Sequence, residues 1–189
     1  MKTNEDILTA ATRHLNANPT ASMAGIASAI GISRATLHRH FVSREALLHA
    51  LGDRATECWA GSLRSAGIDA ATASGDPGEL RAALGALLNA YVVDADEHGF
   101  ALTDHFVNHL PDLVARGEEL EEREVAFYEA CQRAGVLRAD LPARWFSSAV
   151  YGLLVGARES LRRGEVARRD LGRILLTTFL DGTGPPAGP

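Results

Sequence analysis

Apolar residues recur every three or four positions along this chain, and no segment alternates apolar and polar residues as a half-buried strand would. The first such stripe predicts a helix over about residues 4–17, capped by Thr3 and ended by Asn18-Pro19. Its apolar members are Ile7, Leu8, Ala11 and Leu15. The pattern therefore predicts an amphipathic helix at the start of the chain.

Three further helices follow, each opened by a serine that can accept a hydrogen bond from an otherwise free backbone N–H. They are predicted over residues 22–30, residues 33–41, and residues 43 to about 65. Gly31 stands between the first two of them, where a tight turn favours a residue that tolerates positive φ. The first 50 residues are therefore predicted as closely spaced helices.

The stretch 66–78 is rich in Gly, Ala, Ser and Asp and contains Pro77, so it is predicted as a connecting loop. From Asp181 onward the chain reads DGTGPPAGP, which holds too much Gly and Pro for ordered packing. Between them the apolar pattern predicts helices near 79–97, 99–109, 112–134, 142–162 and 166–181. The predicted fold class is all-α, with about nine helices.

Composition adds limits to this picture. With 189 residues, of which 46% are hydrophobic, the chain can bury a core, and no apolar run approaches the ~18 residues of a membrane helix. The opening MKTNEDILTA has acids where a signal peptide needs an apolar run. Cys58 and Cys131 form neither a disulfide framework nor a zinc pattern, which favours a reduced, cytoplasmic setting.

The charge is distributed unevenly. The whole chain carries −5, yet residues 1–50 hold five Lys or Arg against three Asp or Glu. The first 50 residues are thus mildly basic at +2, which leaves −7 for the rest. This asymmetry is expected when one end of a protein meets phosphate.

The segment 22–41, SMAGIASAIGISRATLHRHF, carries the functional prediction. A helix-turn-helix needs a small residue where its helices cross, a turn residue, and apolar residues that hold the second helix. Ala27 and Gly31 meet the first two needs, and Ile32 and Leu37 meet the third. The spacing therefore predicts a helix-turn-helix.

Two pairs at i, i+4 spacing then face outward from the second of these helices. They are Arg34 with His38 and Thr36 with His40. A helix of this size fits the major groove, where Arg reads guanine and Thr contacts a thymine methyl group or a phosphate. An ordinary helical hairpin is the alternative, but it does not explain so many potential cations on one short helix.

These residues resemble the Tet repressor (TetR) family of bacterial regulators. Residues 32–48, ISRATLHRHFVSREALL, are similar to the family signature, and Ile26-Ala27 and Gly31 stand where the family has Ile-Ala and Gly. The resemblance covers about residues 4–50, and residues 133–142 resemble the family's C-terminal half more loosely. It implies a homodimer whose heads contact successive major grooves of DNA, with a helical body that binds a small molecule.

The resemblance also implies which residues contact DNA. They are Ser22, Ser33, Arg34, Thr36, His38, Arg39, His40 and Arg44. Nearest the bases would be Ser33, Arg34 and Thr36. His40 and Arg44 would contact phosphate, and His38 stands where the family usually has Tyr. Residues 24–25, Ala-Gly, replace a pair that is often polar or charged, so each head is expected to bind DNA modestly and to need its partner.

The body offers a candidate ligand pocket. Aromatic residues are spread over the helices that line the ligand cavity in resembling proteins, and core packing is the alternative for each of them. The predicted ligand-binding residues are Trp59, Tyr91, Phe100, His105, Phe106, Phe127, Tyr128, Cys131 and Trp145. The acidic run from Glu118 to Glu124 is predicted as a solvated helix face.

Three histidines, His98, His105 and His109, lie close together in the sequence, and the last two are spaced i, i+4 as metal ligands can be. Asp104 and Cys131 could complete a metal site. Pocket-lining or solvent-facing side chains explain these residues more simply, so neither a metal nor another cofactor is predicted.

The last two predicted helices have apolar faces, and Gly152 and Gly156 permit a close approach between helices. Paired across a two-fold axis they would form a four-helix bundle, whereas burial within one chain is the alternative. The predicted interface residues are Phe146, Val150, Leu153, Leu154, Ala157, Leu171, Ile174, Leu175 and Thr178.

The chain has no GxSxG, HExxH, Walker or GxGxxG motif, so no enzyme is predicted. The predicted domains are residues 1–48 for DNA binding, 49–182 for ligand binding and dimerisation, and a disordered tail, 183–189. The predicted function is a ligand-responsive regulator, most simply a repressor. It would bind a palindromic operator as a homodimer and be released by a small apolar or amphipathic effector. The alternatives are an all-helical small-molecule or metal-binding protein without operator binding, or an enzyme.

Overall fold

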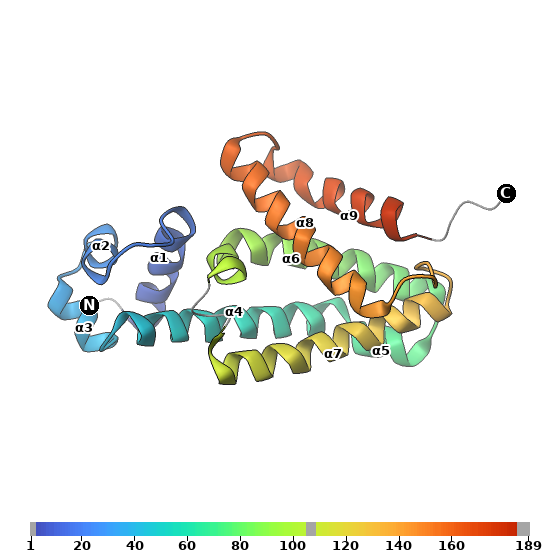
Figure 1. Cartoon of the computed structure of the whole chain (residues 1–189), viewed down its shortest axis with the longest axis horizontal. Helices are drawn as coiled ribbons and strands as arrows, with labels where there is room; N and C mark the ends of the chain where they lie inside the picture. The colour runs from blue at the N-terminus through green and yellow to red at the C-terminus, as the bar shows by residue number, and fades with distance from the viewer. Residues whose placement is uncertain (1–2, 105–108, 185–189) are drawn as a thin grey trace. The chain divides into compact units, whose positions relative to one another are not determined.

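The computed structural model describes residues 3–104 and 109–184, and within these residues the chain forms nine helices and no strand (Figure 1). The all-α class expected from the apolar pattern is confirmed. The helices are α1 Asn4–Ala17, α2 Met23–Ala29, α3 Arg34–His40, α4 Arg44–Ala66, α5 Ile68–Ser74, α6 Pro77–Thr103, α7 Pro111–Arg133, α8 Ala143–Arg163 and α9 Arg168–Thr183.

The first helix begins as its sequence predicts. Thr3 forms a capping box with Asp6: the Thr3 hydroxyl accepts a hydrogen bond from the Asp6 backbone N–H, and the Asp6 carboxylate accepts one from the Thr3 backbone N–H at 2.8 Å. The apolar stripe that includes Ile7 and Leu15 is buried. Local capping and burial of one face therefore both favour this helix.

The predicted loop over 66–78 is wrong, because the structure has the two-turn helix α5 there. Gly67 and Gly75 flank it with φ of 70° and 68°, a region that glycine enters without steric cost. Ile68 is fully buried and Ala71 is nearly so. Burial of this apolar side thus stabilises a segment that its composition assigns to a turn.

The helices predicted near 79–97 and 99–109 adjoin at a kink in the structure and together make up α6, which ends at Thr103. The kink lies at His98, between the two predicted helices, where φ of −117° and ψ of 16° are not helical. Residues 105–108 lie outside the described residues.

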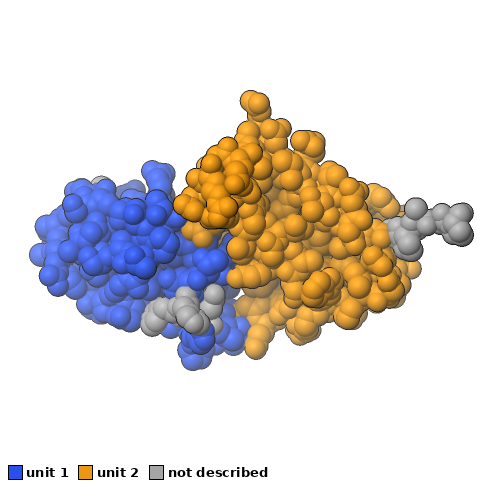
Figure 2. Space-filling view, turned by 45° about the horizontal axis from the view of Figure 1, so that its top comes forward, with its two compact units in different colours: residues 1–57, 96–116 blue, residues 58–95, 117–189 orange. Residues whose placement is uncertain are grey.

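The chain divides into two compact units (Figure 2). The first comprises residues 1–57 and 96–116, and the second comprises residues 58–95 and 117–189. In the first unit, Leu47 and Leu51 of α4 are buried in the same core as α1, α2 and α3. The predicted domain boundary after residue 48 stays a prediction. None of the described helices is long and apolar enough to cross a membrane.

Candidate nucleic-acid interface and ligand-binding core

Helix α3, the second helix of the predicted helix-turn-helix, is held against α2 by a tight turn and by one fully buried leucine. Gly31 has a φ of 72°, and the next residue, Ile32, donates its backbone N–H to the carbonyl oxygen of Ala27 at 3.0 Å. Leu37 is fully buried in the core that also contains Ile26. Because this side of α3 is fixed, its opposite side is presented to solvent.

Serine hydroxyls cap both helices of the motif. The hydroxyl of Ser22 accepts a hydrogen bond from the Gly25 N–H at 3.2 Å, and that of Ser33 accepts one from the Thr36 N–H at 3.0 Å. The Ser33 and Thr36 hydroxyl oxygens lie 2.9 Å apart. The first turn of α3 therefore carries two ordered hydroxyl groups, each of which keeps capacity for a further hydrogen bond.

Basic side chains follow these hydroxyls along α3. Arg34 and Arg39 are exposed, and the Arg34 Nε donates to the His38 Nε2 at 3.4 Å. The other ring nitrogen of His38 lies 3.3 Å from the carbonyl oxygen of Val42. The predicted outward pair of Arg34 and His38 is thus a hydrogen-bonded pair on the open face of the helix.

Two residues with predicted phosphate contacts have other partners here. The Nδ1 of His40 lies 2.5 Å from the Asn4 side-chain oxygen, and its buried Nε2 has no hydrogen-bond partner among the described residues, so the ring is directed to α1. The phosphate contact of His40 stays a prediction. Arg44 donates to the carbonyl oxygens of Ala21 at 3.2 Å and Pro19 at 3.0 Å, so it positions the loop between α1 and α2.

A chain of hydrogen bonds joins α4, α6 and α7 within the second unit. The Trp59 Nε1–H donates to the Tyr91 hydroxyl at 2.8 Å, and that hydroxyl donates to the Glu124 carboxylate. Tyr91 and Glu124 are buried, whereas Trp59 is half-buried. Three of the long helices thus meet at a buried acid.

Burial raises the pKa of Glu124 from 4.5 to about 7, although hydrogen bonds from Tyr91 and Trp59 act in the opposite direction and nearby Glu121 raises it further. The pKa of Tyr91 is raised well above its ordinary value, first by burial and then by the Glu124 charge. Glu124 is therefore close to half-protonated at neutral pH, while Tyr91 stays a neutral donor.

Tyr128, one turn along α7 from this acid, belongs to a cluster of aromatic rings. Tyr128 is fully buried, with its ring centroid 5.8 Å from those of Phe127 and Phe146. Burial, followed by the charge of Glu124, raises the pKa of Tyr128 well above its ordinary value. Burial also raises the pKa of Cys131 to about 12, so its thiol stays protonated and unreactive near neutral pH.

The sequence reading missed Glu124, which it placed on a solvated face. The side chain is only 4% exposed. The spacing along the helix indicates the burial of this acid. The buried side chains of α7 recur every three or four residues, and they include Leu120, Glu124, Phe127 and Cys131, so the acid lies in the apolar stripe of α7.

The other predicted ligand residues do not all join this cluster. Trp59, Tyr91, Phe127, Tyr128 and Cys131 belong to the second unit. Phe100 belongs to the core of the first unit, and Trp145 is 55% exposed, so neither is part of the cluster. His105 and Phe106 lie outside the described residues.

The predicted histidine cluster forms no metal site in the part of the chain that the structure describes, where no three His, Cys, Asp or Glu side chains are placed to hold an ion. His98 is buried in the first unit, whereas Cys131 belongs to the second. His105 lies outside the described residues.

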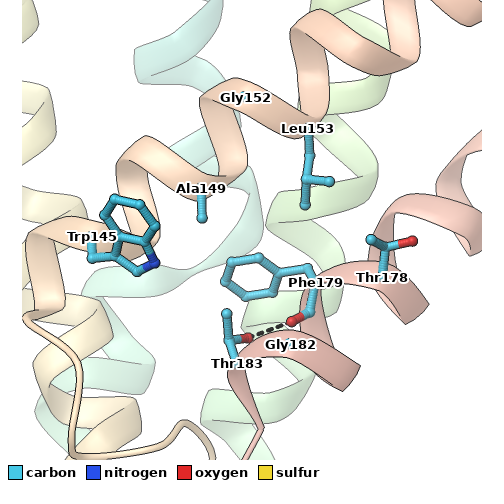
Figure 3. A pocket seen from close by; sticks show the side chains of 8 residues that line it. All are labelled: Trp145, Ala149, Gly152, Leu153, Thr178, Phe179, Gly182 and Thr183. Carbon is cyan, nitrogen blue, oxygen red and sulfur yellow. Dashed lines mark hydrogen bonds between the residues drawn. The ribbon is translucent and has the colours of Figure 1, made fainter.

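A surface pocket lies between α8 and α9, and Trp145, Leu153 and Thr178 line it (Figure 3). The ring of Phe179 forms its floor and is almost fully buried. The small residues Gly152 and Gly182 also border the pocket. This part of the α8–α9 surface is therefore apolar, hollow and open to solvent.

This arrangement corrects part of the predicted dimer interface. Five of its nine residues are buried within the chain itself, because they form the contact between α8 and α9 and the rest of the core. They are Phe146, Val150, Leu154, Leu171 and Leu175. The remaining four, Leu153, Ala157, Ile174 and Thr178, are half-buried or exposed, and their place in an interface stays a prediction.

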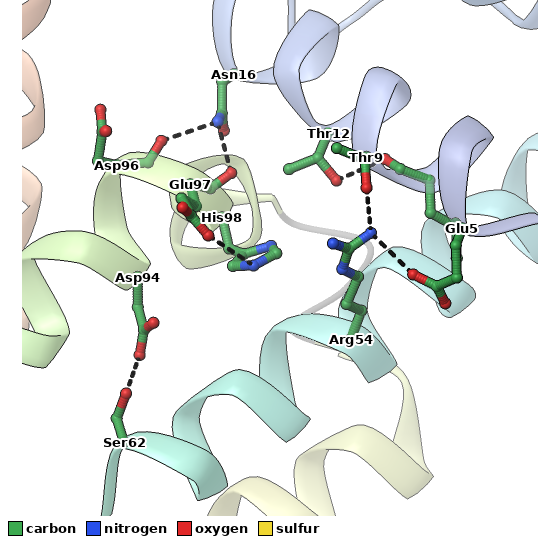
Figure 4. A network of polar contacts seen from close by, with 11 residues as sticks. Glu5, Thr9, Thr12, Asn16, Arg54, Ser62, Asp94, Asp96, Glu97 and His98 are labelled. Carbon is green, nitrogen blue, oxygen red and sulfur yellow. Dashed lines mark hydrogen bonds and ion pairs between the residues drawn. The ribbon is translucent and has the colours of Figure 1, made fainter. Parts of the chain in front are cut away.

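Side-chain hydrogen bonds fasten α1 to two other helices of the first unit (Figure 4). The Asn16 amide donates to the carbonyl oxygens of Asp96 and Glu97 at 3.1 and 2.8 Å, just before the kink of α6. From α4, Arg54 donates to the Thr9 hydroxyl at 2.8 Å. The first helix of the head is therefore tied to both α4 and α6.

Comparison with known proteins agrees with this geometry. The model of the family "Bacterial regulatory proteins, tetR family" matches residues 7–51, which span α1 to α3 and the start of α4. The chain is 28% identical to the HTH-type transcriptional regulator NfxB of Pseudomonas aeruginosa over 175 residues, covering 89% of this chain and 88% of NfxB. It is 27% identical to the HTH-type transcriptional repressor LfrR of Mycolicibacterium smegmatis over 184 residues, covering 96% and 90%.

Solved structures share the whole fold. LfrR in complex with proflavine superposes with a TM-score of 0.73 at 24% identity over 94% of each chain. AibR in complex with isovaleryl coenzyme A and operator DNA superposes with a TM-score of 0.67 at 15% identity, over 92% of this chain and 96% of AibR. Residues 7–51 therefore match the DNA-binding domain of the TetR family, and over most of its length the chain is similar to transcriptional regulators with this domain.

Proposed function

We propose that this regulator is a ligand-responsive repressor that binds a palindromic operator as a homodimer and is released by a small apolar or amphipathic effector. The observation that carries the proposal is the open face of α3, where Ser33, Arg34 and Thr36 stand together while Leu37 fixes the opposite side. Half-sites about one or two helical turns apart suit two such heads. Its place of action would be the cytoplasm.

What the relatives bind supports this proposal. LfrR is named a repressor and has been crystallised with proflavine, and AibR with both isovaleryl coenzyme A and operator DNA. In this chain, the buried cluster at Tyr91 and Glu124 provides aromatic and polar groups for a small molecule. We therefore assign effector binding to the second unit.

Two helices are suited to transmit the effector's presence. Both α4 and α6 contribute residues to each unit: α4 has Leu47 in the head core and Trp59 in the polar cluster. Asn16 and Arg54 fasten α1 to these same helices. An effector that binds the released conformation better by ~1–3 kcal/mol is enough to lower the affinity for the operator by roughly 5- to 150-fold.

Selection of bound fragments from a random DNA pool tests the operator half of the proposal. The full-length protein is expected to enrich an inverted repeat, and adding candidate effectors to the purified complex is expected to release it. Failure to enrich any sequence at physiological salt would contradict operator binding, and a complex insensitive to every effector would contradict ligand release.

Dimerisation makes a separate prediction. Changing Leu153 to Asp places a charge on the apolar α8–α9 surface, which should convert the dimer to a monomer in sedimentation velocity and weaken operator binding about a hundredfold or more. The matched control changes Val93, which is 55% exposed on α6, to Asp, and should stay dimeric. A Leu153→Asp protein that sediments as the wild type would place the interface elsewhere.

A further inference from the structure

The buried carboxylate of Glu124 receives hydrogen bonds, but no positively charged side chain among the described residues acts on it. Its donors, Tyr91 and Trp59, are neutral, and the other charged group that acts on it, Glu121, is negative. Glu121 is itself paired with Arg144 at 3.1 Å on the surface. A buried acid without a cation destabilises the fold, so packing alone gives no reason for its presence.

A second buried group close to this acid is also unsatisfied. The hydroxyl of Tyr128 has no hydrogen-bond partner among the described residues, although the side chain is fully buried. It lies one turn along α7 from Glu124, whose charge acts on Tyr128 and on Tyr91 alike. Because nearly all buried polar groups are hydrogen-bonded, a fully buried orphan hydroxyl beside an uncompensated acid indicates a place for a ligand.

The surroundings indicate the chemistry of that ligand. The rings of Trp59, Tyr91 and Tyr128 offer flat apolar surface and negative ring faces, which attract organic cations. A metal ion is a poor fit, because no cluster of three ligating side chains occurs in the described ranges. One carboxylate matches one positive charge.

We propose that Glu124 is the recognition group for an organic monocation with a flat aromatic body, which binds in the second unit among Trp59, Tyr91 and Tyr128. The cation pairs with the Glu124 carboxylate and the aromatic body contacts the rings. Since Trp59 is the half-buried member, the ligand displaces its indole from the Tyr91 hydroxyl on entering. This inference rests on the proposed function, whose effector class it names.

Binding is linked to pH, because the cation favours the ionised acid. The titratable groups around Glu124 are Tyr91 on α6 and Tyr128 and Glu121 on α7, while α4 contributes the neutral Trp59. Both tyrosines stay uncharged between pH 6 and 8, since their pKa values are raised well above the ordinary value of 10.0. Because the pKa of Glu124 is about 7, affinity for a permanent cation should rise about tenfold over this range.

The test compares two fluorescent probes of the same shape on the full-length protein: 10-methylacridinium, which is permanently charged, and 9-methylanthracene, which is neutral. The wild type should bind the cation about tenfold more tightly at pH 8 than at pH 6 and should bind the hydrocarbon without pH dependence. Glu124→Gln should lower affinity for the cation at least tenfold at pH 8, abolish its pH dependence, and leave hydrocarbon binding unchanged.

Two further variants serve as controls for charge and for folding. Glu118→Gln removes an exposed acid from the same helix and should bind both probes as the wild type does. Glu124→Asp keeps the charge and should keep the pH dependence, which covers the case in which the amide variant folds poorly. The inference is overturned by equal affinity of wild type and Glu124→Gln for the cation, or by no cation binding at pH 8. The probes are titrated without DNA, so this test is independent of operator binding. A cation that binds through Glu124 but leaves the operator complex intact would contradict release by the effector, while the cation site itself would stand.

Discussion

Replacing both Arg34 and Thr36 by alanine is expected to weaken operator binding at least about a thousandfold. Each direct base contact of this kind contributes roughly 1–3 kcal/mol, and a dimer would lose two contacts from each of two heads. The fold should survive, because Arg34 is exposed, Thr36 is half-buried, and the buried anchor of α3 is Leu37. The effect therefore falls on recognition and not on stability.

A gel-shift titration at fixed salt measures this loss, with circular dichroism to confirm that the variant is folded. Arg81→Ala on α6 removes one positive charge from an exposed position of the second unit and should leave operator affinity within about twofold. Unchanged operator affinity in the double variant would show that α3 does not read the bases.

The head could be predicted from the sequence because its determinants are local. Helix caps at Thr3 and Ser33, the turn glycine Gly31 and the buried Leu37 all act within a few residues of where they stand in the chain. Each signal specifies both an element and its boundary, so the helices of the motif begin and end close to the predicted residues.

Contacts between distant segments could not be predicted in the same way. Ile68 stabilises α5 by burial against a core that the local composition does not show. The stripe of α8 that includes Phe146 and Leu154 was correctly identified as apolar, but periodicity does not distinguish burial in one's own chain from burial in a partner. Where such a stripe packs is a tertiary property.

Site roles transferred from a resemblance have a similar limit. His40 and Arg44 stand at positions with implied phosphate contacts, yet His40 turns to Asn4 and Arg44 fastens the loop at Pro19 and Ala21. A match of residue types places the Cα atom but not the direction of a long or planar side chain. Neighbouring acceptors on α1 and its loop decide that direction here.

Replacing Glu124 by glutamine is expected to remove a pH dependence of about 2–3 kcal/mol from the free energy of unfolding between pH 5 and 8. Burial raises the pKa of this acid in the folded protein from 4.5 to about 7. In that window the folded protein keeps a proton that the unfolded chain has lost. The free energy of unfolding therefore falls as the pH rises from about 4.5 to about 7. Above about pH 7, Glu124 adds no further pH dependence.

Urea unfolding of ligand-free wild type, Glu124→Gln and Glu118→Gln at a series of pH values isolates this contribution. The Glu118→Gln curve should follow the wild type, since that side chain is exposed, whereas the Glu124→Gln curve should flatten and cross above it toward pH 8. Parallel curves for all three proteins would mean that Glu124 is ionised in the folded state well below pH 7. In that case the protein's own groups would stabilise the ionised carboxylate of Glu124. The acid would then need no external cation, and the proposed cation site would lose its support.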